Sequence, residues 1–247
     1  MGEGIGFVLI PGGGMSDWLW ARLLPRLSTP SISIGRRLRE NTRESRLGAS
    51  FDDCLDYAAE ETRSSPFSSY VLVAHSGSGI LAGALAMRLA PQVAHLVFIA
   101  ANIPPSGMKA LDSLPPELRE RNARALRAQA ARDSIPMREM EGIFRSAFCN
   151  TCFEEDISFV LEQDFLPEPL CALEARADWL SFPAIGRTYI VLERDRTLSV
   201  EAQEGMAANL GIGDIRRIDS GHLAPISHPE ELARILEGVA AEAASPR

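Results

Sequence analysis

Short apolar runs alternate with longer segments of helical periodicity along most of the chain, and this alternation limits the fold more than any other sequence feature. The runs end at glycine, proline or polar residues, as residues 6–10 do before Pro11 and the glycines that follow it. Strands are expected at residues 6–10, 31–35, 69–74, 93–100, 187–192 and 214–218, and helices at 17–27, 51–63, 78–89, 200–210 and 229–241. Repeated strand–helix units predict an α/β protein with a mostly parallel sheet and helices on both of its faces.

Residues 104–182 interrupt this alternation. They contain no convincing strand pattern, and helical periodicity is evident at 117–132 and 137–148, between several prolines. We interpret this stretch as a helical cap, inserted between two strands of a core that comprises residues 1–103 and 183–247. The length of 247 residues suits one domain with such an insertion.

The segment VLVAHSGSG at residues 71–79 carries the clearest chemical signal. It places Ser76 directly after an apolar strand and before a helix, with the small residues Ala74 and Ser78 two positions away on either side. A sharp strand–turn–helix of this kind is typical of a nucleophile elbow, which raises the serine hydroxyl above the sheet. The backbone N–H of Gly77 would then point to where a carbonyl oxygen binds. A serine-rich turn without a chemical role is the alternative, because turns commonly use serine and glycine.

A serine hydroxyl needs a base to accept its proton, and the sequence offers four histidines. His222 follows the last expected strand and precedes the last expected helix. In chains with a nucleophile elbow the base comes after the serine in the sequence, as His222 does here. His75 adjoins the serine but should point away from it, His95 lies in an apolar strand, and His228 precedes the last helix. We therefore expect His222 to be the general base.

An acid that orients the histidine should follow a strand between the serine and the histidine. Asp195 meets this condition, because it comes directly after the strand expected at residues 187–192. Glu193 is the second choice, and a simple ion pair of Asp195 with Arg194 or Arg196 is the alternative without function.

The second donor to a carbonyl oxygen is expected from the loop after the first strand. Residues 11–14 read PGGG, and we assign the backbone N–H of Gly13 to this role beside that of Gly77. The contiguous glycines lack the spaced pattern of a dinucleotide-binding loop, and no Gly-Lys-Ser/Thr follows to make a phosphate-binding loop.

Composition limits the partners. The formal net charge of −8 makes nucleic-acid binding unfavourable, and no apolar stretch is long enough to predict a membrane span. With no secretory signal evident at the N-terminus, we expect a cytoplasmic protein with reduced cysteines, and a homodimer is compatible with the sequence. The C-x-x-C pair Cys149 and Cys152 lacks the strand–helix setting of a redox motif, and no metal site is expected. The arginine-rich residues 36–46 are expected to form an exposed loop.

These motifs together resemble the small plant-type and bacterial members of the α/β-hydrolase superfamily, related to hydroxynitrile lyases, methyl-salicylate-type esterases and pyrethroid-hydrolase-like esterases. The resemblance lies in the opening strand with Trp18 and Trp20, in residues 147–152 and 167–170, and in residues 221–232 around the histidine. It implies the α/β-hydrolase fold and a cofactor-free enzyme for small esters. The chain departs from the group at Pro11, where a histidine is usual, and at Gly77, where a larger residue is usual. Leu223 stands where hydroxynitrile lyases of this type carry a lysine, which argues against cyanohydrin cleavage.

The sequence therefore predicts a serine hydrolase that cleaves a small apolar carboxylic ester or lactone through an acyl-enzyme. Two alternatives stay open: a C–C hydrolase, cyclase or lyase for a polyketide-like or aromatic molecule with the same triad, and a non-catalytic small-molecule receptor. The residues expected to contact the substrate are Trp18, Met140, Phe144 and Phe148.

Overall fold

The computed structural model describes residues 4–35, 43–113, 116–132, 134–167 and 169–245. Its centre is a six-stranded sheet in the order β2-β1-β3-β4-β7-β8, and every neighbouring pair of strands is parallel. The strands are β1 (Ile5–Ile10), β2 (Ser31–Ser33), β3 (Ser69–His75), β4 (Val93–Ile99), β7 (Gly186–Leu192) and β8 (Asp214–Ile218). The predicted parallel sheet is confirmed.

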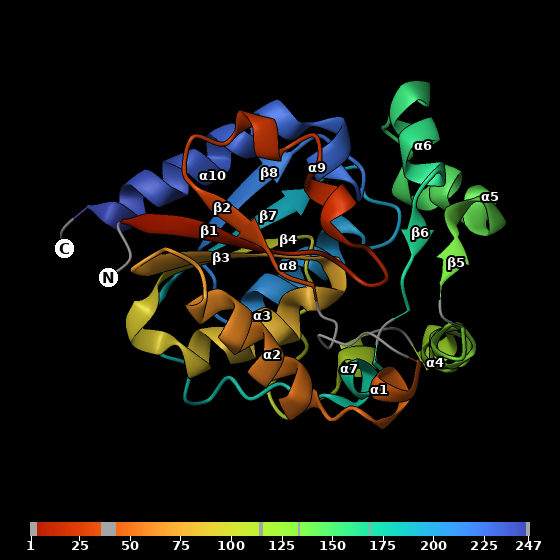
Figure 1. Cartoon of the computed structure of the whole chain (residues 1–247), viewed down its shortest axis with the longest axis horizontal. Helices are drawn as coiled ribbons and strands as arrows, with labels where there is room; N and C mark the ends of the chain where they lie inside the picture. The colour runs from red at the N-terminus through yellow and green to blue at the C-terminus, as the bar shows by residue number, and fades with distance from the viewer. Residues whose placement is uncertain (1–3, 36–42, 114–115, 133, 168, 246–247) are drawn as a thin grey trace.

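Helices cover both faces of this sheet, as predicted (Figure 1). The long helix α10 (Pro229–Ala244) packs on one face with the first 3₁₀ turn at Asp17–Trp20. Helices α2 (Phe51–Arg63), α3 (Gly79–Arg88) and α8 (Val200–Asn209) pack on the other. Alternate strand residues therefore enter two separate apolar cores: Val71 and Val73 face α10, whereas Leu72 and Ala74 face the opposite helices. Strands buried on both faces explain the unbroken apolar runs in the sequence.

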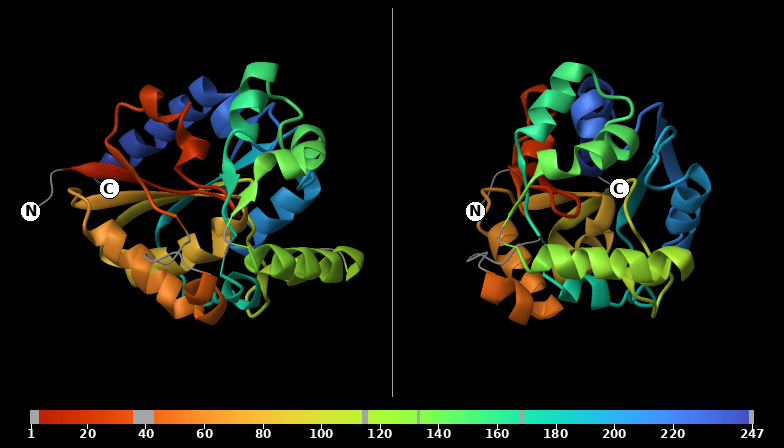
Figure 2. Two further views of the ribbon diagram at one scale, coloured as in Figure 1. Left: turned by 45° about the vertical axis from the view of Figure 1, so that its right-hand side comes forward. Right: turned by 90° about the vertical axis from the view of Figure 1, so that its right-hand side faces the viewer.

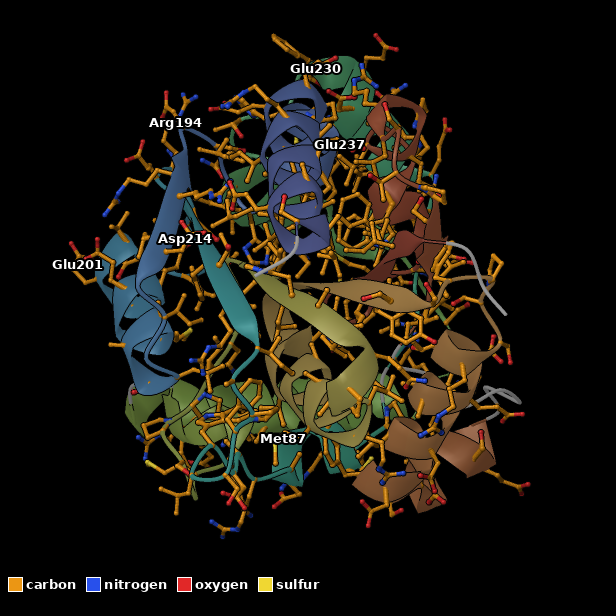
Figure 3. The ribbon with its side chains drawn as sticks, turned by 90° about the vertical axis from the view of Figure 1, so that its left-hand side faces the viewer. Met87, Arg194, Glu201, Asp214, Glu230 and Glu237 are labelled. Atoms are coloured by element: carbon orange, nitrogen blue, oxygen red, sulfur yellow. The ribbon has the colours of Figure 1, made fainter. Side chains whose placement is uncertain are left out.

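The C-terminal helix is fastened to the N-terminal segment by one carboxylate. Glu237 of α10 accepts hydrogen bonds from the backbone N–H groups of Ser28 and Thr29, at 2.6 and 2.9 Å, and from the Thr29 hydroxyl at 2.7 Å. Figure 3 shows Glu237 on α10, close to this first segment of the chain. These bonds hold the chain just before β2, at one edge of the sheet.

The segment between β4 and β7 contains most of the structure outside the core. Its helices are α4 (Pro116–Ala130), α5 (Glu141–Ile143), α6 (Glu154–Leu161) and α7 (Cys171–Glu174). Figures 1 and 2 show α4, α5 and α6 on the side of the molecule where the parallel strands end. Side chains at the ends of these strands therefore lie beneath this segment.

Two expectations for this segment were wrong. It does contain strands, because β5 (Ile135–Pro136) pairs antiparallel with β6 (Asp164–Phe165). Two-residue strands are too short to produce a detectable alternation of apolar and polar residues. The single helix expected at residues 137–148 is instead a 3₁₀ turn at Met137–Met140, then α5, then a π-helical turn at Phe144–Phe148.

The N-terminal part of the chain also differs from two expectations. The helix expected at residues 17–27 is only two 3₁₀ turns, at Asp17–Trp20 and Leu24–Arg26. Three consecutive residues of the first turn are buried, which a long amphipathic helix with one wet face does not allow.

Of the loop expected at residues 36–46, positions 36–42 lie outside the described residues. The rest begins α1 (Arg43–Gly48), and the side chain of Arg46 is buried, where its Nη2 donates to the backbone oxygen of Arg132 at 2.8 Å. A guanidinium can be buried where carbonyl oxygens accept its hydrogen bonds, so an arginine-rich stretch need not be exposed. Within the described ranges, no helix is long and apolar enough to cross a membrane.

Candidate active site

The chain turns sharply at Ser76, between β3 and α3. Ser76 has a φ of +52°, a conformation that residues with a side chain rarely adopt. Ala74 and Ser78 are completely buried on either side of it. The Ser78 hydroxyl donates to the backbone oxygen of Pro11, and the N–H of Asn102 donates to the Ser76 carbonyl at 2.8 Å. The turn is therefore held by the loops that follow β1 and β4, and Pro11 contributes as a carbonyl acceptor.

The structure brings Ser76, His222 and Asp195 into one hydrogen-bonded series. The Oγ of Ser76 lies 2.9 Å from Nε2 of His222, and Nδ1 of His222 lies 2.6 Å from Oδ2 of Asp195. The side chains of His222 and Asp195 are 1% and 0% exposed. Because Asp195 accepts the proton on Nδ1, the free lone pair of the neutral imidazole is on Nε2, facing the serine hydroxyl.

The second oxygen of Asp195 is held by the residues that follow it. Oδ1 accepts from the Thr197 backbone N–H at 2.7 Å, from the Thr197 hydroxyl at 2.8 Å and from the Leu198 N–H at 3.2 Å. Burial alone would raise the pKa of Asp195, but His222 and the Thr197 hydrogen bonds outweigh it and lower that pKa below its ordinary value. The carboxylate therefore stays ionised beside the imidazole. The Thr197 hydroxyl also lies 2.7 Å from Nδ1 of His222, a contact that sequence reasoning missed.

The alternatives for the acid lie elsewhere. Glu193 is exposed and forms an ion pair with Arg217 at 3.7 Å. Arg194 pairs with Asp219, and Arg196 donates to the backbone oxygen of Ser146 at 3.2 Å. The neighbouring arginines are thus engaged with other partners, and Asp195 faces His222.

Two of the remaining histidines form hydrogen bonds with residues other than Ser76. His95 hydrogen-bonds through Nε2 to the Thr188 hydroxyl at 2.9 Å, and His228 lies at the start of α10 beside Ser227. His75 is different, because its ring centroid is 4.7 Å from that of His222, and its Nε2 donates to the His222 carbonyl at 2.9 Å. The residue before the serine therefore supports the histidine loop, which the sequence did not indicate.

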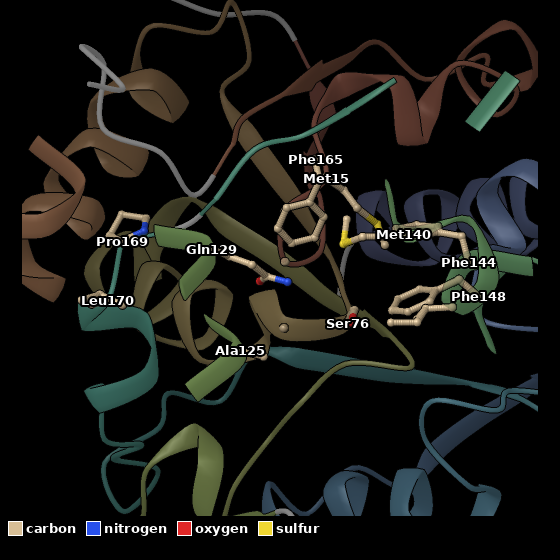
Figure 4. A pocket seen from close by; sticks show the side chains of 14 residues that line it. Met15, Ser76, Ala125, Gln129, Met140, Phe144, Phe148, Phe165, Pro169 and Leu170 are labelled. Atoms are coloured by element: carbon tan, nitrogen blue, oxygen red, sulfur yellow. The ribbon is translucent and has the colours of Figure 1, made fainter. Parts of the chain in front are cut away.

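A cavity of about 350 Å³ opens in front of Ser76 (Figure 4). It is lined by Gly13, Gly14, Met15, Ser76, Gly77, Ala125, Gln129, Met140, Ile143, Phe144, Phe148, Phe165, Pro169 and Leu170. Most of this wall comes from the segment between β4 and β7, and nearly all of it is apolar. The cavity suits a small apolar molecule.

The structure places the expected contact residues as follows. Met140, Phe144 and Phe148 line the cavity, and the rings of Phe144 and Phe148 stack with centroids 4.7 Å apart. Trp18 does not belong to the described cavity wall; it is buried in the core beneath α10. Three consecutive buried residues in its short turn explain this position, since Trp18 faces inward with its neighbours.

Gly13 and Gly77, the expected oxyanion donors, both lie on the cavity wall beside Ser76. The loop that carries Gly13 is fixed by the next residue, because Gly14 has a φ of +71° and its carbonyl accepts from the Leu166 N–H at 2.8 Å. A Cβ on Gly14 would lie 1.9 Å from the Phe165 ring. Only glycine permits this close packing of the loop against β6.

The segment between β4 and β7 also contacts the histidine loop directly. The Gly221 N–H donates to the Thr151 hydroxyl at 2.8 Å, and Nδ2 of Asn150 donates to the Arg194 carbonyl at 2.9 Å. The ring of Phe148 meets the His222 ring edge-on, at a centroid distance of 5.2 Å. Residues 148–151 therefore pack against the loops of both His222 and Asp195.

The described ranges contain neither a metal-binding group of side chains nor a disulfide. No three side chains of His, Cys, Asp or Glu are grouped there so as to hold a metal ion. None of the four cysteines forms a disulfide, and the Sγ atoms of Cys54 and Cys171 lie 3.7 Å apart. A hydrogen bond with Cys149 and burial raise the pKa of the Cys152 thiol, which disfavours the reactive thiolate.

Known proteins share the family and the fold of this chain. The sequence profile of the alpha/beta hydrolase family matches residues 7–235, and the chain therefore belongs to that family. A search of curated protein sequences finds no match. The fold and the resemblance inferred from the sequence are confirmed, and membership of the family supports a hydrolase activity.

Several solved structures share the fold over nearly the whole chain. An extracellular alpha/beta-hydrolase from a Paenibacillus species, described as sharing structural and functional homology with tobacco salicylic acid binding protein 2, is 17% identical with a TM-score of 0.77. That alignment covers 95% of this chain and 98% of the other. Polyneuridine aldehyde esterase is 19% identical with a TM-score of 0.72, covering 96% and 100%. Methylketone synthase I from tomato is 16% identical with a TM-score of 0.73, covering 97% and 99%.

Proposed function

We propose that this chain hydrolyses a small apolar carboxylic ester or lactone through an acyl-enzyme formed on Ser76. The observation that carries the proposal is the series Asp195–His222–Ser76, with contacts of 2.6 and 2.9 Å, at the wall of an apolar cavity. A serine hydroxyl hydrogen-bonded to an oriented, neutral imidazole is the arrangement that nucleophilic acyl transfer requires.

In the proposed reaction, Ser76 Oγ attacks the ester carbonyl carbon while its proton passes to Nε2 of His222. The carbonyl oxygen becomes an oxyanion, which the backbone N–H groups of Gly13 and Gly77 would stabilise. Asp195 offsets the charge of the imidazolium and keeps the ring oriented. His222 then gives its proton to the departing alcohol, and water releases the acid from Ser76 by the same steps in reverse order. The reaction uses no cofactor.

The choice of an ester rests on two further points. Apart from Ser76 and Gln129, glycine and apolar residues make up the described cavity wall, so a neutral apolar substrate is favoured. Structures that share the fold include polyneuridine aldehyde esterase and a pyrethroid hydrolase, whose names refer to ester or pyrethroid cleavage. We place the cap over the site at residues 104–182, between the core segments 1–103 and 183–247.

Replacement of the nucleophile tests the proposal. Ser76→Ala should lower kcat/KM for p-nitrophenyl esters of short acids by at least about a thousandfold, because the covalent route is lost. The exposed Ser64, at the end of α2, provides the matched control Ser64→Ala, which should keep wild-type activity. The measurement is release of p-nitrophenol, together with labelling of the wild type by a fluorophosphonate.

Three outcomes separate the alternatives. Ser76→Ala activity within about tenfold of wild type would remove the mechanism, since loss of a nucleophile reduces rates far more. Labelling of Ser76 without ester turnover would favour C–C cleavage, cyclisation or elimination by the same three residues. Absence of both labelling and turnover would favour a receptor.

A further inference from the structure

Gln129 is the one residue besides Ser76 that brings a polar side chain to the described wall of the cavity. It belongs to α4, and Ala125, one turn earlier, lines the same cavity. Figure 4 shows the Gln129 side chain extending into the space between Phe165 and Ser76. A helix that turns this face to an apolar cavity would ordinarily carry apolar residues there.

The amide oxygen of Gln129 lacks a hydrogen-bond partner among the described residues. This atom, Oε1, is buried. The fully buried Gln203 differs, because its Oε1 accepts from the Leu192 N–H at 2.9 Å and its Nε2 donates to the Leu192 carbonyl at 3.0 Å. An unpaired buried amide oxygen is unfavourable, so its presence on the wall of the cavity that also holds Ser76 points to a partner supplied by a ligand.

The backbone that carries Gln129 is fixed. The Arg132 N–H donates to the Gln129 carbonyl at 2.9 Å, and the buried Arg46 donates to the Arg132 carbonyl at 2.8 Å. The second of these bonds ties the end of α4 to α1. The amide is therefore presented from a held position, as a recognition group must be.

We infer that Gln129 recognises a hydroxyl group on the substrate, so that the substrate is a small ester with an apolar body and a hydroxyl apart from the reacting carbonyl. This inference rests on the proposed ester hydrolysis. A hydroxyl can donate to Oε1 and accept from Nε2, so it matches either orientation of the amide. A charged group is disfavoured, because the described cavity wall carries no charged side chain to balance it.

Matched pairs of esters test this inference. The probes are methyl phenylacetate and methyl 3-phenylpropanoate, with and without a para hydroxyl, and 2-phenylethyl acetate with and without the same group. These place the hydroxyl on the acid or the alcohol side of the ester. The quantity measured is the ratio of kcat/KM for the hydroxylated ester to that for its unsubstituted partner.

For at least one pair, wild-type enzyme should prefer the hydroxylated ester, and Gln129→Met should lower that ratio by about tenfold, as loss of one such hydrogen bond does. Methionine keeps the length of the side chain and removes both polar atoms. Gln129→Leu serves as a second variant if the first fails to fold. Gln92→Met, at an exposed glutamine outside the cavity, should leave every ratio unchanged.

A ratio that is the same in wild type and Gln129→Met for every pair would overturn the inference while leaving ester hydrolysis intact. If wild-type enzyme hydrolyses none of these esters, the proposed function fails, and calorimetric binding of the intact pairs decides about Gln129. Tighter binding of the hydroxylated member that is lost in Gln129→Met would then support the inference. Equal binding of both members would overturn it.

Discussion

His75 is the side chain of the site whose surroundings most strongly oppose a positive charge. It is completely buried, its Nε2 donates to the His222 carbonyl, and its other ring nitrogen has no hydrogen bond among the described residues. Burial, with a smaller effect from the nearby His222, lowers the pKa of His75 to about 3. The neutral ring supports the loop of the proposed base without adding a charge next to it.

The depressed pKa of His75 predicts how stability depends on pH. Below pH 6.5 the unfolded chain binds a proton at this residue, whereas the folded chain does not until about pH 3. Stability is therefore lost as the pH falls through this window. Between pH 6.5 and 4.5, wild type should lose about 2 kcal/mol more unfolding free energy than His75→Gln, because the loss approaches 1.36 kcal/mol per pH unit only once the unfolded histidine is mostly protonated. Urea unfolding at the two pH values measures this difference.

The control for this experiment is His228→Gln, at a half-buried histidine near the start of α10. This variant retains His75, so it should lose as much unfolding free energy between the two pH values as wild type does. Carboxyl groups titrate in all three proteins and cancel in the comparison. If His75→Gln loses as much stability as wild type over this range, His75 is protonated in the folded protein and the interpretation of its burial is wrong.

At the scale of elements, the loop after β1 and strand β6 form one unit although they are far apart in sequence. The loop carries Gly13 to the cavity, and β6 presses Phe165 against Gly14. The Leu166 N–H also donates a hydrogen bond to the Gly14 carbonyl. The position of the proposed oxyanion donor thus depends on a two-residue strand in the segment between β4 and β7.

Gly14→Ala should destabilise the protein by about 2–4 kcal/mol, because it adds both a left-handed alanine and a clash with Phe165. In a Phe165→Ala background the clash is gone, and the same substitution should cost only about 1–2 kcal/mol for the backbone. Denaturant unfolding of the four proteins gives both values. Gly213→Ala, where a Cβ meets nothing within 4 Å, is the control with little expected effect. Equal costs in the two backgrounds would show that Phe165 does not press on this loop.

Sequence patterns predicted the long elements well and the short ones poorly. Helix α2 and strand β8 begin and end where expected, because each has a continuous pattern of its own. Strand β6 and the 3₁₀ turn with Trp18 were missed, because tertiary contacts rather than local periodicity define them.

Within the site, chain order was enough to select Ser76, Asp195 and His222, whose contacts the structure describes. Thr197, Thr151 and Gln129 were not selected. Each has an ordinary polar side chain without a motif, and its importance comes only from what lies beside it in the folded chain. Thr151, for example, meets Gly221 across 70 positions of sequence.

At the scale of the whole molecule, the segment between β4 and β7 has two roles. It forms most of the cavity wall, and it contacts the loop that carries His222. Residues 148–151 contact His222, Gly221 and Arg194 at once. The position of the proposed base is therefore set partly from outside the sheet, so changes in this segment should affect turnover.

Thr151→Val tests this dependence, because valine keeps the shape of the side chain and removes the acceptor of the Gly221 N–H. Loss of this bond should lower kcat/KM for esters, and the rate of fluorophosphonate labelling, by about tenfold, while the unfolding free energy falls by about 1–2 kcal/mol. Thr151→Ser keeps the hydroxyl and should restore both rates. If Thr151→Val is labelled by the fluorophosphonate at the wild-type rate, the histidine loop is positioned without this segment.

The hydrogen bonds at residues 150 and 151 also bear on how molecules travel to and from Ser76. If the cavity opened by movement of Phe148, the contacts that hold His222 in position beside Ser76 would break. Among the described residues, Pro169 and Leu170 also lie on the cavity wall, and neither is hydrogen-bonded to Ser76, His222 or Asp195. We therefore expect arrival and departure of small molecules on that side, so that an exit route can widen while the proton-transfer groups stay in place.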